Sequence, residues 1–169
     1  MLPAAAQAGN ASWLKTLTPE PVKGNSPAKE YQRQVAGENE YPIPTGLKDA
    51  PGEATRSRMF ADGYRPADGA VLEAKYTGIP DNCSPNRTSP YDIRHIQADA
   101  AGEDVRPWAR RALDGQRFEM ERYAAAERFD PVHVRQVEVI INNPVLNPYF
   151  RYLMDESHVH GWIRVELAK

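Results

Sequence analysis

The stretch MFADGYRPADGAVLEAKYTG, residues 59–78, decides what kind of sheet this chain can build. Two strand-like runs flank the turn PADG, whose Asp-Gly pair is a strong hairpin signal. With the turn placed there, Gly63 pairs with Leu72 and, one step further out, Asp62 pairs with Glu73. Directly opposed residues of an antiparallel pair lie roughly 5 Å apart on one face. The sequence therefore predicts a hairpin that brings two carboxylates together.

Two ionised carboxylates at that separation repel each other unless a cation neutralises them, and Mg²⁺ prefers such oxygen ligands. Period-2 alternation puts Lys75 on the same face as Glu73, where an ammonium would orient a water and stabilise charge on a phosphate. The alternative interpretation needs no chemistry, because alternating Glu and Lys is also ordinary on a solvated strand face. A register slip of one residue would remove the pairing of Asp62 with Glu73.

The rest of the chain predicts helices and further strands around this hairpin. SPAKEYQRQVAG, residues 26–37, has Ser26 to cap a short helix, Pro27 at its first position and Gly37 to stop it. This order of elements predicts an α/β fold of the mixed α+β kind, in which a central mixed sheet with an antiparallel hairpin is flanked by helices. The other predicted segments are an extended piece at 41–43, helices near 93–101, at 106–128 and at 147–156, strands at 132–141 and 158–167, and a polar loop at 78–92.

Composition limits the size and class of the protein. The 169 residues are 41% apolar and 26% charged, which suits one globular domain. The formal charge of -2 gives no bulk electrostatic case for nucleic acid, the single cysteine excludes an intramolecular disulfide, and no apolar run is long enough to span a membrane. Residues 1–25 are predicted to be a linker or N-terminal extension with one turn around Trp13, as in a domain cut from a longer protein, and residues 26–169 the functional domain.

An Asp shortly before a strand that carries Glu-x-Lys resembles the signature of the PD-(D/E)xK, or restriction-endonuclease-like, nucleases. More narrowly, EYQRQVAG followed by FADGYRPADGAVLEAKY is similar to the fifth class of restriction-endonuclease-fold toxins, which lie at the C-termini of bacterial polymorphic toxins. The likeness spans roughly residues 28–78 and implies a restriction-endonuclease-like core. An extra Ala61 between Phe60 and Asp62 departs from the family's pattern.

The resemblance implies metal-dependent hydrolysis of a phosphodiester bond. Asp62 and Glu73 would hold Mg²⁺ or Mn²⁺, together with the backbone carbonyl of Ala74. Lys75 would position the attacking water. Gln32 would reach the site from the first helix.

Two alternative site residues stay open: Glu30 in place of Gln32, and Asp68 as the acidic residue if the turn lies elsewhere. The resemblance also implies a secreted effector, delivered by a larger secreted protein or a secretion system, that acts on DNA in the cytoplasm of a target cell. A cognate immunity protein would neutralise it, and no membrane is involved. RNA is the alternative substrate, and a non-catalytic protein-interaction domain of the same fold is the alternative function.

The helix predicted at residues 106–128 carries six arginines. Arg110, Arg117 and Gln116 are candidates for contacts with substrate, although i,i+4 pairing with acidic neighbours is an equal explanation for the arginines. A third hypothesis uses His158 and His160, whose spacing puts both on one face of a strand, as in some metal sites. No matching third ligand lies nearby in the sequence.

Overall fold

The computed structural model describes residues 1–49, 51, 55–76, 96, 98–99, 101–104 and 107–169. Their strands form two sheets: one of three antiparallel strands in the order β1-β2-β3, and one of four strands in the order β4-β5-β6-β7. The predicted loop at 78–92 and most of the predicted helix near 93–101 lie outside the described residues. The elements are α1 (Ala4–Thr16), β1 (Glu20–Pro21), α2 (Pro27–Val35), β2 (Asn39–Pro44), β3 (Arg58–Ala61), β4 (Gly63–Arg65), β5 (Ala70–Lys75), α4 (Pro107–Phe129), β6 (Gln136–Ile141), the 3-10 turn η1 (Pro144–Leu146), α5 (Asn147–Glu156) and β7 (Gly161–Val165).

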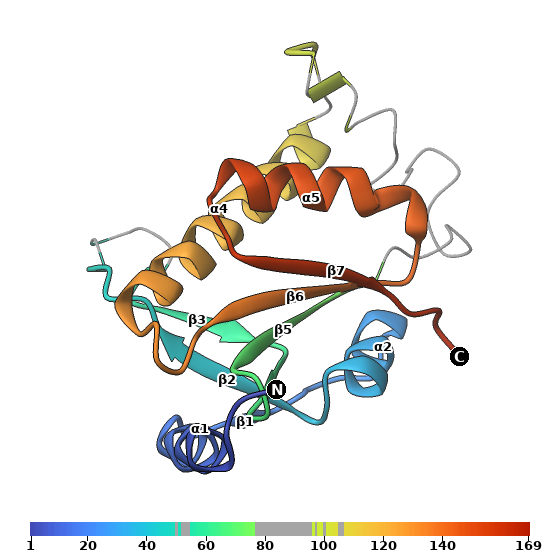
Figure 1. Cartoon of the computed structure of the whole chain (residues 1–169). Coiled ribbons are helices and arrows are strands. Elements are labelled where there is room, and N and C mark those ends of the chain that lie inside the picture. The colour runs from blue at the N-terminus through green and yellow to red at the C-terminus, as the bar shows by residue number, and fades with distance from the viewer. Residues whose placement is uncertain (50, 52–54, 77–95, 97, 100, 105–106) are drawn as a thin grey trace.

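The four-stranded sheet is mixed, as the sequence predicts. β4 and β5 form an antiparallel hairpin, whereas β5, β6 and β7 run parallel to one another. Figure 1 shows α4 and α5 over one face of this sheet and α2 on the other. The helices explain why β5 is buried over almost its whole length.

The predicted hairpin register is confirmed from Gly63 opposite Leu72 to Arg65 opposite Ala70. The turn closes with Gly69 at φ 73°, a conformation that glycine adopts without steric cost. Asp62, however, is not paired in the ladder, because β3 pairs with β2 in the other sheet and β4 begins only at Gly63. Asp62 therefore stands at the bend where the chain passes from one sheet to the other.

Two apolar clusters occupy the two faces of the sheet, and β5 contributes to both. Val71 packs in the cluster on the α4 and α5 side with Met120, whereas Leu72 packs with Tyr31 of α2. By the same alternation Glu73 and Lys75 point toward α4. The solvated-face interpretation is wrong, because Glu73 is only 4% exposed and Lys75 only 7% exposed.

The helix predicted at residues 26–37 is confirmed as α2. The Ser26 side chain accepts a hydrogen bond from the Lys29 backbone N–H at 3.4 Å, and Pro27 occupies the first position. The expectation of one turn around Trp13 is wrong, because the structure forms the 13-residue helix α1 there. Where the domain begins stays a prediction.

The histidines of HVHGW are not on a strand. His158 has φ 57°, and β7 begins only at Gly161. The hypothesis that a strand presents His158 and His160 on one face is therefore wrong. None of the helices among the described residues is long and apolar enough to cross a membrane.

Candidate active site

Asp62 reaches the edge of β5 from the bend between the two sheets. Its Oδ2 accepts a hydrogen bond of 2.8 Å from the backbone N–H of Ala74. Burial raises the pKa of the Asp62 carboxyl to about 6; the Ala74 N–H and the charge of Lys75 lower it, and the charge of Glu119 raises it further. Asp62 thus sits beside Glu73 without being its ladder partner.

Glu73 is the buried centre of the site. The Tyr123 hydroxyl donates to its Oε2, and its Oε1 lies 2.5 Å from the Lys75 ammonium. Burial, followed by the charges of Asp62 and Glu119, holds the pKa of Glu73 well above its ordinary value. The ionised form of this carboxylate is therefore disfavoured by its surroundings.

Lys75 stands between two carboxylates, because its Nζ also pairs with Glu119 of α4. The Lys75 side chain is 8% exposed and that of Glu119 is 20% exposed. The ammonium is therefore held in one place at the floor of the site, next to Glu73.

Gln32 approaches the same site from α2. It is 3% exposed, and its Nε2 donates to Glu40 Oε1 at 3.0 Å. Lys29 Nζ donates to Gln32 Oε1 at 2.8 Å and to Glu40 Oε1 at 2.6 Å. Burial alone would raise the pKa of Glu40, but hydrogen bonds from Lys29 and Gln32 bring it below its ordinary value. Glu30, the alternative to Gln32, is exposed and is not among the residues that line the cavity described next.

A cavity of about 380 Å³ joins these groups. The predicted residues Gln32, Asp62 and Glu73 lie in its wall, and Lys75 lies behind Glu73. Asp68, the alternative acid, lies at the far end of the hairpin, where its carboxylate pairs with Arg65 and accepts the Ala70 N–H. The full lining is Ala28, Lys29, Gln32, Glu40, Phe60, Asp62, Glu73, Ala74, Glu119 and Arg122.

The predicted substrate contacts on α4 divide between two faces of that helix. Arg110 and Arg117 both pair with Asp99, which is 8% exposed. Arg117 precedes Glu119 by two residues and so lies roughly 200° away from it around the helix. Gln116 lies one turn before Glu119 on its face of the helix, with its side-chain oxygen buried and without a hydrogen-bond partner among the described residues.

A larger cavity, about 630 Å³, lies two turns further along α4 and contains both His158 and His160. His160 Nδ1 is 3.1 Å from the Glu127 carboxylate, but the His160 side chain is 85% exposed. Within the described parts of the chain no three His, Cys, Asp or Glu side chains are arranged to hold a metal ion. Asp62 and Glu73 line the smaller cavity instead.

Sequence reasoning missed the residues that α4 brings to the site. Arg122 and Tyr123 follow Glu119 by three and four residues, which places all three on one side of the helix. Tyr123 had the signal of an inward-facing aromatic residue, but nothing local showed that β5 would lie beneath it.

The donor set suits a divalent cation held by two side chains. Burial raises the pKa of both carboxyls, and the charge of Asp62 raises the pKa of Glu73 further, so a cation near them would stabilise their ionised forms. Mg²⁺ commonly takes one or two carboxylates and completes its shell with waters and substrate phosphates. The residues present therefore fit the metal that the fold implies.

Comparison with known proteins adds the family. Neither a search of curated proteins nor a search of solved structures gives a match to this chain. A protein-family comparison matches residues 27–160 to restriction endonuclease fold toxin 2. This match confirms the expected assignment to the toxins of restriction endonuclease fold. The matching family is number 2, whereas the hairpin motif resembles the fifth class. The match covers most of the chain, including Gln32, Asp62, Glu73 and Lys75, and it agrees with the mixed sheet flanked by helices. The chain belongs to the restriction endonuclease fold toxin 2 family.

Proposed function

We propose that this domain is a divalent-metal-dependent nuclease that hydrolyses phosphodiester bonds in DNA. The observation that carries the proposal is that Asp62 and Glu73 line one cavity, both with raised carboxyl pKa values, while the Lys75 ammonium is paired with Glu73 behind the cavity wall. A family of nuclease-fold toxins makes phosphodiester hydrolysis the chemistry to test first.

Asp62 and Glu73 would hold Mg²⁺ or Mn²⁺, with the backbone carbonyl of Ala74. When bound, the metal supplies positive charge that polarises a phosphate and favours ionisation of a water. Lys75 is fixed against Glu73, so its ammonium can hold the attacking water and stabilise charge that develops on the phosphate. Gln32, locked by Lys29 and Glu40, presents a fixed amide at the cavity wall.

The test is cleavage of supercoiled plasmid by the purified domain with Mg²⁺, beside reactions with EDTA and with the Asp62→Asn variant. Asparagine keeps an oxygen that can accept the Ala74 N–H, so the bend should persist while the metal loses a charged ligand. Nicking or linearisation by the wild type, and its loss in both controls, supports the proposal. Plasmid that stays supercoiled while an RNA substrate is cut would reassign the substrate, and two intact substrates would contradict nuclease activity.

The family also supports a biological setting. The domain would be a secreted effector, carried by a larger secreted protein or a secretion system, that cuts DNA in the cytoplasm of a target cell. A producing cell would need a cognate immunity protein. The measurement is bacterial growth on induction of the wild-type domain compared with the Asp62→Asn variant, and equal growth of the two would argue against a toxic nuclease.

A further inference from the structure

The cavity has a cation that no described carboxylate neutralises. Asp62 is bonded to the Ala74 N–H, and Glu40 pairs with Lys29. Glu119 pairs with Lys75. Arg122 also lines the cavity, and among the described residues no Asp or Glu forms an ion pair with it. Its one hydrogen bond there is a long one, 3.5 Å from Nη1 to the carbonyl of Thr55.

A second arginine, Arg56, lies over the same aromatic ring as Arg122. The guanidinium carbon of Arg122 lies 4.9 Å from the centroid of the Phe118 ring, and that of Arg56 lies 5.9 Å from the same centroid. The Arg56 backbone N–H donates to Asp49, but within the described parts of the chain the Arg56 side chain likewise has no acidic partner, and the Nε of each arginine is buried without a hydrogen-bond partner there. We call Arg56, Phe118 and Arg122 the arginine pair on Phe118.

We propose that the arginine pair on Phe118 binds backbone phosphates of the DNA that lies across the cavity, an inference that rests on the proposed nuclease function. Guanidinium donors suit phosphate oxygens, and stacking on an aromatic ring fixes the donors before the ligand arrives. Most protein–DNA hydrogen bonds go to the phosphate and sugar backbone, so such contacts also suit a domain with little sequence preference.

The other candidates on α4 are less available. Arg110 and Arg117 are both engaged by the buried carboxylate of Asp99, so a phosphate would have to displace an existing ion pair. The arginine pair on Phe118 has no such competitor among the described residues, and Arg122 shares a cavity with the residues proposed to cut. A local pair also explains how a chain with a net charge of -2 can hold a polyanion.

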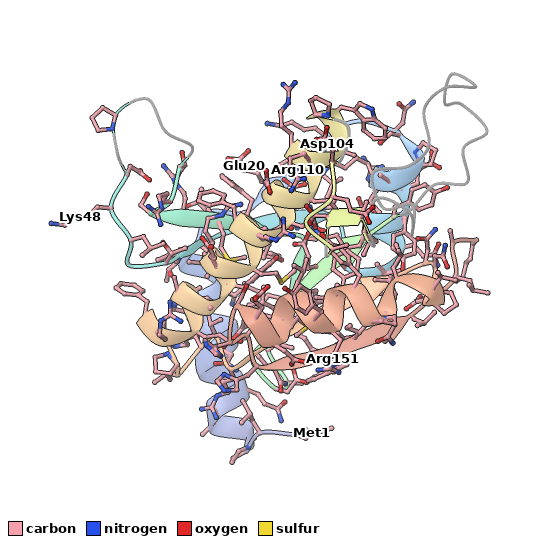
Figure 2. The ribbon with its side chains drawn as sticks, turned by 90° about the horizontal axis from the view of Figure 1, so that it is seen from above. Met1, Glu20, Lys48, Asp104, Arg110 and Arg151 are labelled. Atoms are coloured by element: carbon pink, nitrogen blue, oxygen red, sulfur yellow. The ribbon has the colours of Figure 1, made fainter. Side chains whose placement is uncertain are left out.

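The experiment measures binding of a fluorescein-labelled DNA duplex by anisotropy over a range of salt concentrations. It uses the full chain carrying Asp62→Asn, in EDTA, so that the duplex stays intact. The variants are Arg122→Gln, Arg56→Gln and their double, with Arg122→Lys to restore the charge. Arg151→Gln is the matched control, because Arg151 is exposed on α5 (Figure 2), whereas Phe118 and Arg122 belong to α4. Thermal melting checks that each variant is folded.

Removing one arginine that binds a phosphate should weaken DNA binding and lower the slope of log K against log salt by about 0.9, so the double variant should show a slope smaller by about 1.8. Arg122→Lys should restore most of the slope of Arg122→Gln, which a purely structural role would not do. If the wild type cuts plasmid and the double variant keeps the control's slope, the inference fails and the nuclease stands. If the wild type neither cuts nor binds DNA, the proposed function and this inference fail together.

Discussion

Replacing Lys75 with methionine removes a positive charge from a buried group of titratable side chains. Its ammonium lies 2.5 Å from Glu73 Oε1 and also pairs with Glu119. Methionine keeps most of the apolar stem, so the change leaves little cavity. What it removes is the cation that compensates two carboxylates, one of them 5% exposed and the other 20% exposed.

Breaking a buried ion pair by removing one partner costs about 3–5 kcal/mol, since the remaining charge is left uncompensated. Glu73, whose pKa is already raised, can take up a proton, and Glu119 is the more exposed acid and can turn toward water, so the cost should fall near the lower end, about 3 kcal/mol. With a urea m-value of about 2 kcal/mol/M, the midpoint of unfolding should fall by about 1.5 M. Loss of activity in Lys75 variants therefore has to be separated from loss of fold.

The assay is equilibrium unfolding in urea with EDTA present, followed by circular dichroism. Adding Glu73→Gln to Lys75→Met removes the buried carboxyl that needs either the ammonium or a proton, so the double variant should recover more than half of the lost stability, while plasmid cleavage stays absent. A Lys75→Met protein with the wild-type midpoint would refute the reasoning, because it would mean that no buried pair depends on this ammonium. Recovery of cleavage in the double variant would refute the catalytic role of both residues.

Three further substitutions test the fold. Gly161 has φ 148°, and a Cβ there would collide with the carbonyl of Val137. Gly161→Ala should therefore lower the free energy of unfolding by at least about 3 kcal/mol and yield little soluble protein. Wild-type stability of this variant would contradict the close approach of β7 to β6. Gly115 in α4 has no atom of the described residues within 4 Å of the position of a Cβ, so Gly115→Ala should stabilise by about 1 kcal/mol. An unchanged or lower melting temperature would count against an open helix surface there. Burial raises the pKa of Glu127 above 4.5 although His160 opposes it, so the folded protein binds more protons and loses stability as pH rises through the shifted pKa. Glu127→Gln should therefore raise the melting temperature at pH 7.5 and leave it unchanged at pH 4; a gain independent of pH would contradict the shift.

The parts of the fold that sequence predicted are those fixed by neighbouring residues. The Asp-Gly turn set the register of β4 and β5, and Ser26 with Pro27 set the start of α2. Both signals act within a few residues, where hydrogen bonding and backbone preference decide the outcome. The same local geometry placed Asp62 near Glu73, although it wrongly made the two residues ladder partners.

The parts that were missed depend on distant partners. Within the part of the chain that the structure describes, α1 has no side-chain hydrogen bond at its N-cap. Instead, Trp13 stacks on His133 with ring centroids 4.8 Å apart, and Asn10 donates to the carbonyl of Pro66. Glu119 belongs to the site only because α4 lies over β5. The bend at Asp62 was missed because β3 finds its partner in β2, which no pattern within the hairpin reveals.

The position of Asp62 at the bend between the two sheets also bears on the order of folding. The hairpin closes through a turn at residues 66–69, and hairpins form in about 1–10 μs, so both carboxylates meet early. The parallel pairing of β5 with β6 and the docking of α4 close a much longer loop and follow later. When only the first half of the domain has been synthesised, the nascent chain contains Asp62 and Glu73 but not yet Glu119, Arg122 or Tyr123. On our proposal, the nascent chain is harmless until its second half is folded over the first.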